Sequence, residues 1–180
     1  MLEIRKPQPL GITPSFGFGD RLGLATLGHL DAWRASGSSI QPMFAQQSMR
    51  ELTRTQRKPS EVMGDTMAGL KAGSYTNIWG ADADRLQTPE DINQAVSAGF
   101  TTLTLDVNAF IDCSVDQLDD RELEHRARAV REDLQWIDIY QGTSTLCAEQ
   151  QLPLLPELVR RAALKYGAAI SEAVKLAAHA

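Results

Sequence analysis

Apolar residues recur along the chain in two spacings, one typical of buried strands and one typical of amphipathic helices. Residues 100–106, Phe-Thr-Thr-Leu-Thr-Leu-Asp, are β-branched and apolar and predict the clearest strand. Shorter apolar runs predict earlier strands at residues 40–45 and 75–79. Helical patterns separate these runs, so the sequence predicts strand–helix units in series.

The helices are marked by capping residues as well as by periodicity. Periodicity predicts helices over residues 27–35 and 49–55. A Pro-Ser pair opens the next helix at residue 59, and a glycine closes it at residue 73. The helix that starts at residues 88–91, Thr-Pro-Glu-Asp, has a threonine cap, a proline in its first turn and acids that suit the helix dipole.

Residues 13–29 form a glycine-rich, aromatic run before the first helix. Its glycines allow positive φ angles or close approach to a bound group, and Asp20 and Arg21 add a carboxylate and a guanidinium. We therefore predict a ligand-facing turn. The spacing Gly17-x-Gly19-x-x-x-Gly23 is half a dinucleotide fingerprint, but no hydrophobic strand precedes it, which disfavours a nicotinamide fold.

The alternation of strands and helices predicts one α/β domain over residues 1–180 with a parallel sheet. Two architectures fit: an open doubly wound sheet, or part of a (β/α) barrel with about four strand–helix units. After the fourth strand, apolar positions spaced by four and three residues from Leu123 predict an amphipathic helix. We interpret residues 116–148 as a helical insertion, followed by a last helix.

Polar residues stand at the predicted strand ends. They are Asp20, Gln46, Asp82, Asp84 and Asp106. In either architecture the carboxyl ends of parallel strands meet at one rim, where ligands bind. This convergence is the strongest functional signal in the pattern.

Composition narrows the possible partners. The 180 residues are 43% hydrophobic with a formal charge of −5, so a core is expected and nucleic acid is not an expected partner. No signal peptide or membrane-spanning run is recognisable, which predicts a cytoplasmic protein without a membrane partner. Two distant cysteines, Cys113 and Cys147, and three scattered histidines predict neither a disulfide framework nor a zinc cluster.

Several long motifs resemble the tagaturonate epimerase family of hexuronate catabolism. They are Ser15-Phe-Gly-Phe-Gly-Asp-Arg-Leu-Gly-Leu-Ala-Thr26 with Gly28-His29, Phe44-Ala-Gln-Gln-Ser48, Arg50-Glu-Leu-Thr-Arg-Thr55, Gly80-Ala-Asp-Ala-Asp84, Thr88-Pro-Glu-Asp91, Gly99-Phe-Thr101 and Thr104-Leu-Asp106. The resemblance implies a metal-dependent TIM-type barrel isomerase that interconverts tagaturonate and fructuronate, keto sugar acids that differ at C4. It also implies a truncated member, about half of a barrel.

C4 is not alpha to the carbonyl of such a sugar, so its hydrogen is not acidic and simple proton removal is excluded. Retro-aldol cleavage between C3 and C4, with a divalent metal ion stabilising the enediolate, is the favoured route, and transient oxidation by a nicotinamide is the alternative. The candidate residues are Asp20 and Asp106 as catalytic groups, Arg21, His29, Gln46, Gln47, Arg50 and Asp84 as substrate contacts, and Asp82 and Asp106 as metal ligands.

Each assignment has a structural alternative. Asp20 and Arg21 could brace their loop, Asp84 could simply precede a helix, Asp106 could cap a turn, and His29 could orient a neighbour. At the level of function, the alternatives are a catalytically silent half-barrel that serves in assembly, and a sugar-acid aldolase or isomerase. A homodimer or a second polypeptide that completes the barrel is the expected macromolecular partner, beside a small keto sugar acid.

Overall fold

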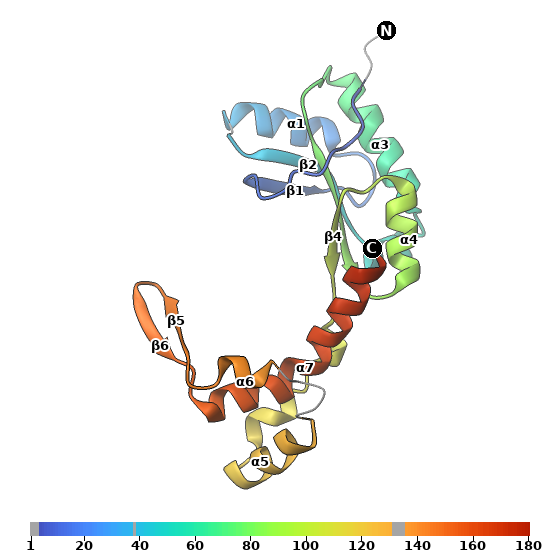
Figure 1. Ribbon diagram of the computed structural model, residues 1–180. Helices are drawn as coiled ribbons and strands as arrows, with labels where there is room; N and C mark the ends of the chain where they lie inside the picture. Colours follow the sequence, from blue (N-terminus) through green and yellow to red (C-terminus); the bar gives the residue numbers. More distant parts are fainter. Residues whose placement is uncertain (1–3, 38, 131–135) are drawn as a thin grey trace. The chain divides into compact units, whose positions relative to one another are not determined.

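Four parallel strands lie in the sheet in the same order as along the chain (Figure 1). They are β1 (Ser15–Gly19), β2 (Gln41–Ser48), β3 (Gly80–Leu86) and β4 (Thr102–Leu105). The structure is a computed structural model that describes residues 4–37, 39–130 and 136–180. The mixed α/β class with a parallel sheet, predicted from the sequence, is confirmed.

The helices between the strands lie close to the ranges that the sequence predicts, and α4 also has the predicted caps. They are α1 (Thr26–Ala35), α2 (Met49–Thr55), α3 (Pro59–Ala72) and α4 (Pro89–Ala98). Thr88 caps α4 reciprocally, because its hydroxyl accepts from the Asp91 backbone N–H at 3.1 Å and its own N–H donates to the Asp91 carboxylate at 3.1 Å. Gly99 ends α4 with a φ of +94°, a conformation that favours glycine.

One strand was not predicted from the sequence, and one was predicted in the wrong position. The glycine-rich run is not only a turn, because β1 lies within it: Phe16 and Phe18 alternate with Gly17 and Gly19. The strand predicted at 75–79 lies instead at Gly80–Leu86. Small buried residues alternate with aspartates in this strand, so it lacks the apolar run that predicts a buried strand.

One side of the sheet is apolar and is packed by helices. Ala45 on β2 pairs with Ala81 on β3, and both residues, like Ala83 on β3, are at most 1% exposed. Helices α1 and α3 pack against β2, and α4 packs against β3. Gln46 on β2 and Asp82 and Asp84 on β3 alternate with these residues and point to the opposite side of the sheet, which we call the polar face.

The amino-terminal segment lies against the start of β3. Trp79, fully buried, donates its indole N–H to the Arg5 carbonyl at 2.8 Å, and the Gln8 N–H donates to the Trp79 carbonyl at 2.9 Å. Gly80 leaves room for Leu10, since a Cβ at residue 80 would lie 2.8 Å from the Leu10 Cδ1 atom. Residues 4–10 thus cover the amino-terminal end of the sheet without forming a helix or strand.

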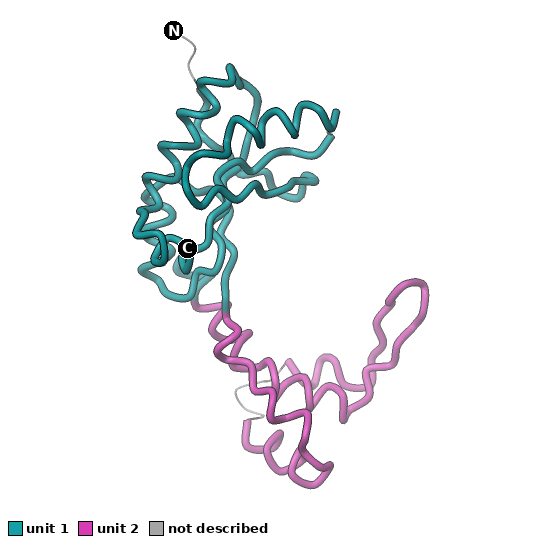
Figure 2. The backbone as a smooth tube through the Cα atoms, turned by 180° about the vertical axis from the view of Figure 1, so that it is seen from behind, with its two compact units in different colours: residues 1–106, 176–180 teal, residues 107–175 magenta. Residues whose placement is uncertain are grey.

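The chain divides into two compact units, residues 1–106 with 176–180, and residues 107–175 (Figure 2). The second unit contains two 3-10 turns (Asn108–Phe110 and Cys113–Gln117), helices α5 (Asp120–Ala129) and α6 (Ile137–Tyr140), an antiparallel hairpin of β5 (Ser144–Cys147) and β6 (Gln150–Pro153), and most of α7 (Pro156–His179).

Ile137, Val159 and Ala163 pack together in the core of the second unit.

The helical insertion predicted over residues 116–148 is only partly helical, because its last residues form strand β5. Part of the helix predicted from Leu123 falls on residues 131–135, outside the described residues. The assignment of residues 1–180 to a single domain stays a prediction. No helix in the described part of the chain is long and apolar enough to cross a membrane.

Candidate functional site

The polar face carries a row of register partners, one from each strand. Gly19 on β1 pairs with Gln46 on β2, Gln46 with Asp82 on β3, and Asp82 with Thr102 on β4. Register partners in a parallel sheet point to the same side. Gln46 and Asp82 are therefore brought together as predicted, on the strands themselves rather than in the loops that follow.

Glycines on β1 make room for the Gln46 side chain. A Cβ at Gly17 would lie 2.8 Å from the Gln46 Cγ atom, and one at Gly19 would lie 3.2 Å from Oε1. Gln46 also hydrogen-bonds to the carboxylate of Asp82. The glycines thus let Gln46 lie close to β1 while its amide reaches Asp82.

Asp82 is the carboxylate with the most altered environment on this face. Thr104, two residues along β4 from Thr102, donates its hydroxyl to Asp82 Oδ1 at 2.9 Å. Burial is the largest influence on the pKa of Asp82 and raises it, and the hydrogen bond from Thr104 lowers it. The charge of Asp84 raises the pKa and the bond from Gln46 lowers it, with a net result above the ordinary value.

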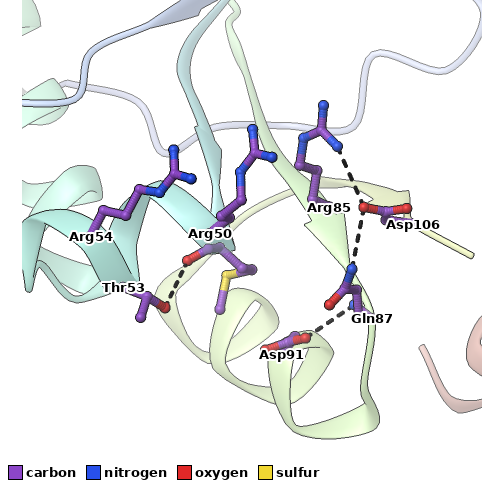
Figure 3. A pocket seen from close by; sticks show the side chains of 8 residues that line it. Arg50, Thr53, Arg54, Arg85, Gln87, Asp91 and Asp106 are labelled. Carbon is purple, nitrogen blue, oxygen red and sulfur yellow. Dashed lines mark hydrogen bonds and ion pairs between the residues drawn. The ribbon is translucent and has the colours of Figure 1, made fainter. Parts of the chain in front are cut away.

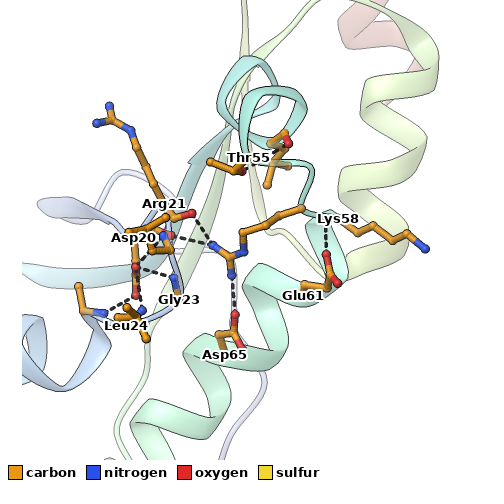
Figure 4. Close-up of polar contacts among 12 residues, drawn as sticks. Asp20, Arg21, Gly23, Leu24, Thr55, Lys58, Glu61 and Asp65 are labelled. Carbon is orange, nitrogen blue, oxygen red and sulfur yellow. Dashed lines mark hydrogen bonds and ion pairs between the residues drawn. The ribbon is translucent and has the colours of Figure 1, made fainter.

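Asp20 holds the loop that follows β1 (Figure 4). Its Oδ1 atom accepts from the backbone N–H groups of Leu22, Gly23 and Leu24 at 3.3, 2.8 and 3.1 Å, and Oδ2 accepts from Ala25 at 2.7 Å. Burial raises the pKa of Asp20, but these four bonds outweigh it, and the pKa lies below its usual value. This geometry supports the bracing alternative, and the catalytic role of Asp20 stays a prediction.

Arg57 reinforces the same loop and was missed by sequence reasoning. Its guanidinium donates to the backbone carbonyls of Asp20 and Arg21 at 3.1 and 2.9 Å and to Asp65 Oδ2 at 2.5 Å. In the sequence Arg57 lies in a basic segment with Arg54 and Lys58, which predicts a solvent-exposed surface. Arg21, predicted to contact substrate, is exposed and forms an ion pair with Glu51 on α2.

Two other predicted substrate contacts lie away from the polar face. Gln47 is 1% exposed, and neither of its amide atoms has a hydrogen-bond partner among the described residues. His29 on α1 lies 5.3 Å from the Phe18 ring, and its buried Nδ1 atom likewise finds no partner in residues 4–37, 39–130 or 136–180. Both positions favour a supporting role, and substrate contact by either stays a prediction.

A cavity of about 420 Å³ opens at the carboxyl ends of the strands, and we call it the rim pocket (Figure 3). Its lining residues are Met49, Arg50, Thr53, Arg54, Arg85, Gln87, Asp91 and Asp106. The two residues in it that were predicted as functional, Arg50 and Asp106, are thus placed at one cavity.

Arg85 and Gln87 bind the carboxylate of Asp106. The Arg85 Nη1 atom lies 3.5 Å from Asp106 Oδ2, and the Gln87 amide donates to the same oxygen at 3.4 Å. Arg85 also lies 3.8 Å from Asp84 and has a φ of +61°, a conformation that is strained for a non-glycine residue. Sequence reasoning did not select Arg85, although it directly follows the Asp-x-Asp motif.

The carboxylates of Asp82 and Asp106 are the candidate ligands for the divalent metal that the resemblance implies. No group of three or more His, Cys, Asp or Glu side chains close enough to hold a metal ion occurs among the residues that the structure describes. Asp106 is engaged by a guanidinium, and Asp82 by a hydroxyl and an amide. The described residues of this chain therefore do not fit a complete metal site by themselves.

Comparisons with a family model and with a curated protein relate this chain to the same family. A family model described as tagaturonate epimerase matches residues 1–179. The tagaturonate/fructuronate epimerase of Thermotoga maritima is 34% identical over 166 residues, which cover 92% of this chain and 34% of that protein.

Solved structures agree with this relationship. A glycerol complex of the fructuronate-tagaturonate epimerase UxaE from Cohnella laeviribosi superimposes with a TM-score of 0.87 at 32% identity, covering 95% of this chain and 35% of that one. The native form of the same enzyme gives a TM-score of 0.86. The chain thus spans about a third of the length of the relatives it matches. This chain belongs to the tagaturonate epimerase family.

Proposed function

We propose that the chain takes part in the interconversion of tagaturonate and fructuronate by inversion at C4. The observation that carries the proposal is the family match along residues 1–179, supported by 34% identity to an epimerase over 92% of the chain. The polar face and the rim pocket support the proposal, because both present polar side chains of parallel strands and the residues that follow them.

The four strand–helix units are part of a (β/α) barrel in this proposal. The strand order follows the sequence without reversal, as in a barrel and unlike a doubly wound sheet, whose order reverses at a switch point. Parallel sheets are normally covered on both faces. A polar face with Gln46, Asp82 and Thr102 suits the lining of a barrel interior near its functional rim.

Retro-aldol chemistry accounts for inversion at C4 without removing the C4 hydrogen. A base takes the proton of the C4 hydroxyl, the C3–C4 bond breaks, and its electrons pass to C3 and the C2 carbonyl as an enediolate. The C4 aldehyde then turns its other face to C3, the bond re-forms, and the proton returns to the C4 oxygen. All atoms are conserved, so the step needs no co-reactant.

Asp82 is the residue that we assign to this proton transfer. A carboxylate whose pKa is raised by burial holds and releases a proton more readily near neutral pH than an ordinary one. Gln46 beside it is placed to contact a substrate hydroxyl. Asp20 is less suited, because four backbone N–H groups already occupy its oxygens and its pKa is lowered.

Metal dependence stays a prediction from the sequence, with Asp82 and Asp106 as candidate ligands, and metal binding by Asp82 would be an alternative to the proton transfer assigned to it. When bound, such an ion would stabilise the enediolate as a Lewis acid. Among the described residues, no group of three or more His, Cys, Asp or Glu side chains is available to complete such a site. A cytoplasmic location is likewise proposed from the sequence.

A second candidate function is assembly without catalysis of its own. Among the strands that the structure describes, β1 and β4 form the two edges of the sheet, and such edges attract further strands. A second copy of the chain or a second polypeptide would extend the sheet at these edges. A sugar-acid aldolase or isomerase would share the C3–C4 chemistry and differ in the fate of the products.

The test combines assembly and activity on one sample. Size-exclusion chromatography with light scattering gives the mass, and NMR then follows tagaturonate incubated with the same fraction and manganese, nickel or zinc. Conversion to fructuronate supports the epimerase proposal. A folded protein that leaves tagaturonate unchanged with every metal contradicts it and favours the assembly function, whereas release of two shorter fragments identifies an aldolase.

A further inference from the structure

The rim pocket gathers three guanidinium groups in a protein whose formal charge is −5. Arg50 and Arg54 come from α2, and Arg85 comes from the end of β3. The three side chains extend in the same direction in Figure 3. Because their charges repel one another, their placement around one cavity is favourable for an anionic ligand.

The acidic residues of the pocket do not fully neutralise this charge. The Asp91 carboxylate accepts from the backbone N–H groups of Gln87 and Thr88 at 3.0 and 3.1 Å, as part of the α4 cap. Asp106 interacts with Arg85 at 3.5 Å and with Gln87 at 3.4 Å. Three positive and two negative side chains leave one net positive charge around the cavity.

Arg50 and Arg54 are the guanidinium groups left for a ligand. They lie one turn apart on α2, where like charges destabilise a helix slightly. Within residues 4–37, 39–130 and 136–180, neither guanidinium has a hydrogen bond or ion pair, in contrast to Arg21, which pairs with Glu51 on the same helix. Two free planar forks suit bidentate recognition of a carboxylate.

We propose that the rim pocket binds the carboxylate group of the sugar acid, with Arg50 and Arg54 as the binding residues and Arg85 as a third positive charge fixed by Asp106. This assignment rests on the proposed function and names the group of the substrate that the pocket takes. One net positive charge matches a monoanionic carboxylate better than a phosphate dianion. The cavity of about 420 Å³ lies in the size range of small-molecule sites.

The position of the pocket also orients the substrate. Arg85 is three residues beyond Asp82 on β3, which corresponds to about 10 Å along an extended strand. A carboxylate held at the rim would direct the rest of the sugar toward Asp82. The pocket therefore sets a preference for keto sugar acids over neutral keto sugars of the same length.

The test measures binding rather than turnover. Tagaturonate is titrated into the ¹⁵N-labelled chain while the Nε–Hε resonances of the arginine side chains are followed, and tagatose, which lacks the carboxylate, is the neutral counterpart. We expect tagaturonate to shift the Arg50 and Arg54 resonances and tagatose to leave them in place. Arg50→Gln and Arg54→Gln should each weaken tagaturonate binding about 10- to 100-fold, the effect of losing a charge-assisted hydrogen-bonded pair.

Arg121→Gln is the matched control, because Arg121 is an exposed arginine of the second unit that lies outside the rim pocket. Equal affinity in Arg54→Gln and Arg121→Gln, or no binding of tagaturonate by the unaltered chain, would overturn the proposal. So would inorganic phosphate that shifts the same resonances at a lower concentration. Turnover is measured separately: epimerisation with unchanged affinity in the variants refutes only the pocket, whereas arginine-dependent binding without epimerisation refutes only the activity.

Discussion

Replacing Asp20 by asparagine should destabilise the protein, because this carboxylate holds the loop between β1 and α1. Asp20 is 7% exposed and accepts four backbone N–H bonds, three at Oδ1 and one at Oδ2. Asparagine keeps one acceptor oxygen and replaces the other by an NH₂ group. With the carbonyl oxygen at the Oδ1 position, that NH₂ would face the Ala25 N–H, which now donates to Oδ2 at 2.7 Å.

The magnitude follows from the lost bond and the donor left without an acceptor. A hydrogen bond to a charged group contributes about 1.5–3 kcal/mol, and a buried unsatisfied donor costs about 1–3 kcal/mol. The two terms overlap, so we expect the Asp20→Asn variant to lose about 2–4 kcal/mol of unfolding free energy, within the range of these contributions. Urea unfolding followed by circular dichroism measures the difference, and Asp31→Asn, at an exposed position of α1, is the matched control.

The pH dependence tests the same reasoning independently. The pKa of Asp20 is lower in the folded protein than in the unfolded chain, so its charge stabilises the fold fully above the unfolded pKa of about 3.9. That stabilisation is lost as the pH falls through the folded pKa, and the gap between the unaltered protein and Asp20→Asn should narrow there. A gap below about 1 kcal/mol at neutral pH, less than one charged hydrogen bond, or one that does not change in acid, would refute this account of Asp20.

Three further predictions follow from local geometry. Thr104→Val removes a hydrogen bond that lowers the pKa of Asp82, so NMR titration of the Asp82 carboxyl should give a higher pKa; an unchanged or lower value would contradict the geometry. Gln56→Gly should stabilise the protein by about 0.5–1 kcal/mol in urea unfolding, because the exposed Gln56 ends α2 with a φ of +56°, whereas Gln56→Ala should bring no gain. Gly17→Ala should displace the Gln46 side chain, 2.8 Å from the added methyl group, at a cost of about 1–3 kcal/mol; a variant as stable as the unaltered protein would show that β1 and Gln46 are not in close contact.

The elements that could be predicted from the sequence are those with strong local signals. Helix α4 carries its threonine cap, proline and closing glycine in the sequence, and its bounds follow from them. Strand β3 has no such signal, because Ala81 and Ala83 are small and Asp82 and Asp84 are polar. Its strand character comes from pairing with β2 and β4, contacts between distant parts of the sequence.

The candidate site likewise contains residues that could be predicted from the sequence and residues that could not. The meeting of Gln46 and Asp82 could be predicted, since polar residues at parallel strand ends share a rim. The roles of Thr104 and Arg57 could not, because each depends on a partner on another element, Asp82 and the carbonyls of the β1–α1 loop. Gln47, next to Gln46, was predicted to contact substrate, but strand alternation buries its side chain on the side of the sheet opposite the polar face.

The central claim is that the polar face around Asp82 serves the epimerisation of a keto sugar acid. The most direct measurement is the rate of fructuronate formation from tagaturonate, followed by NMR, for the unaltered protein, Asp82→Asn and Asp31→Asn under one set of metal conditions. We predict conversion by the unaltered protein and by Asp31→Asn, and a loss of about 10²- to 10⁴-fold in Asp82→Asn, the usual contribution of a general acid–base group. Equal rates for all three proteins, or no conversion by the unaltered protein, would contradict the account.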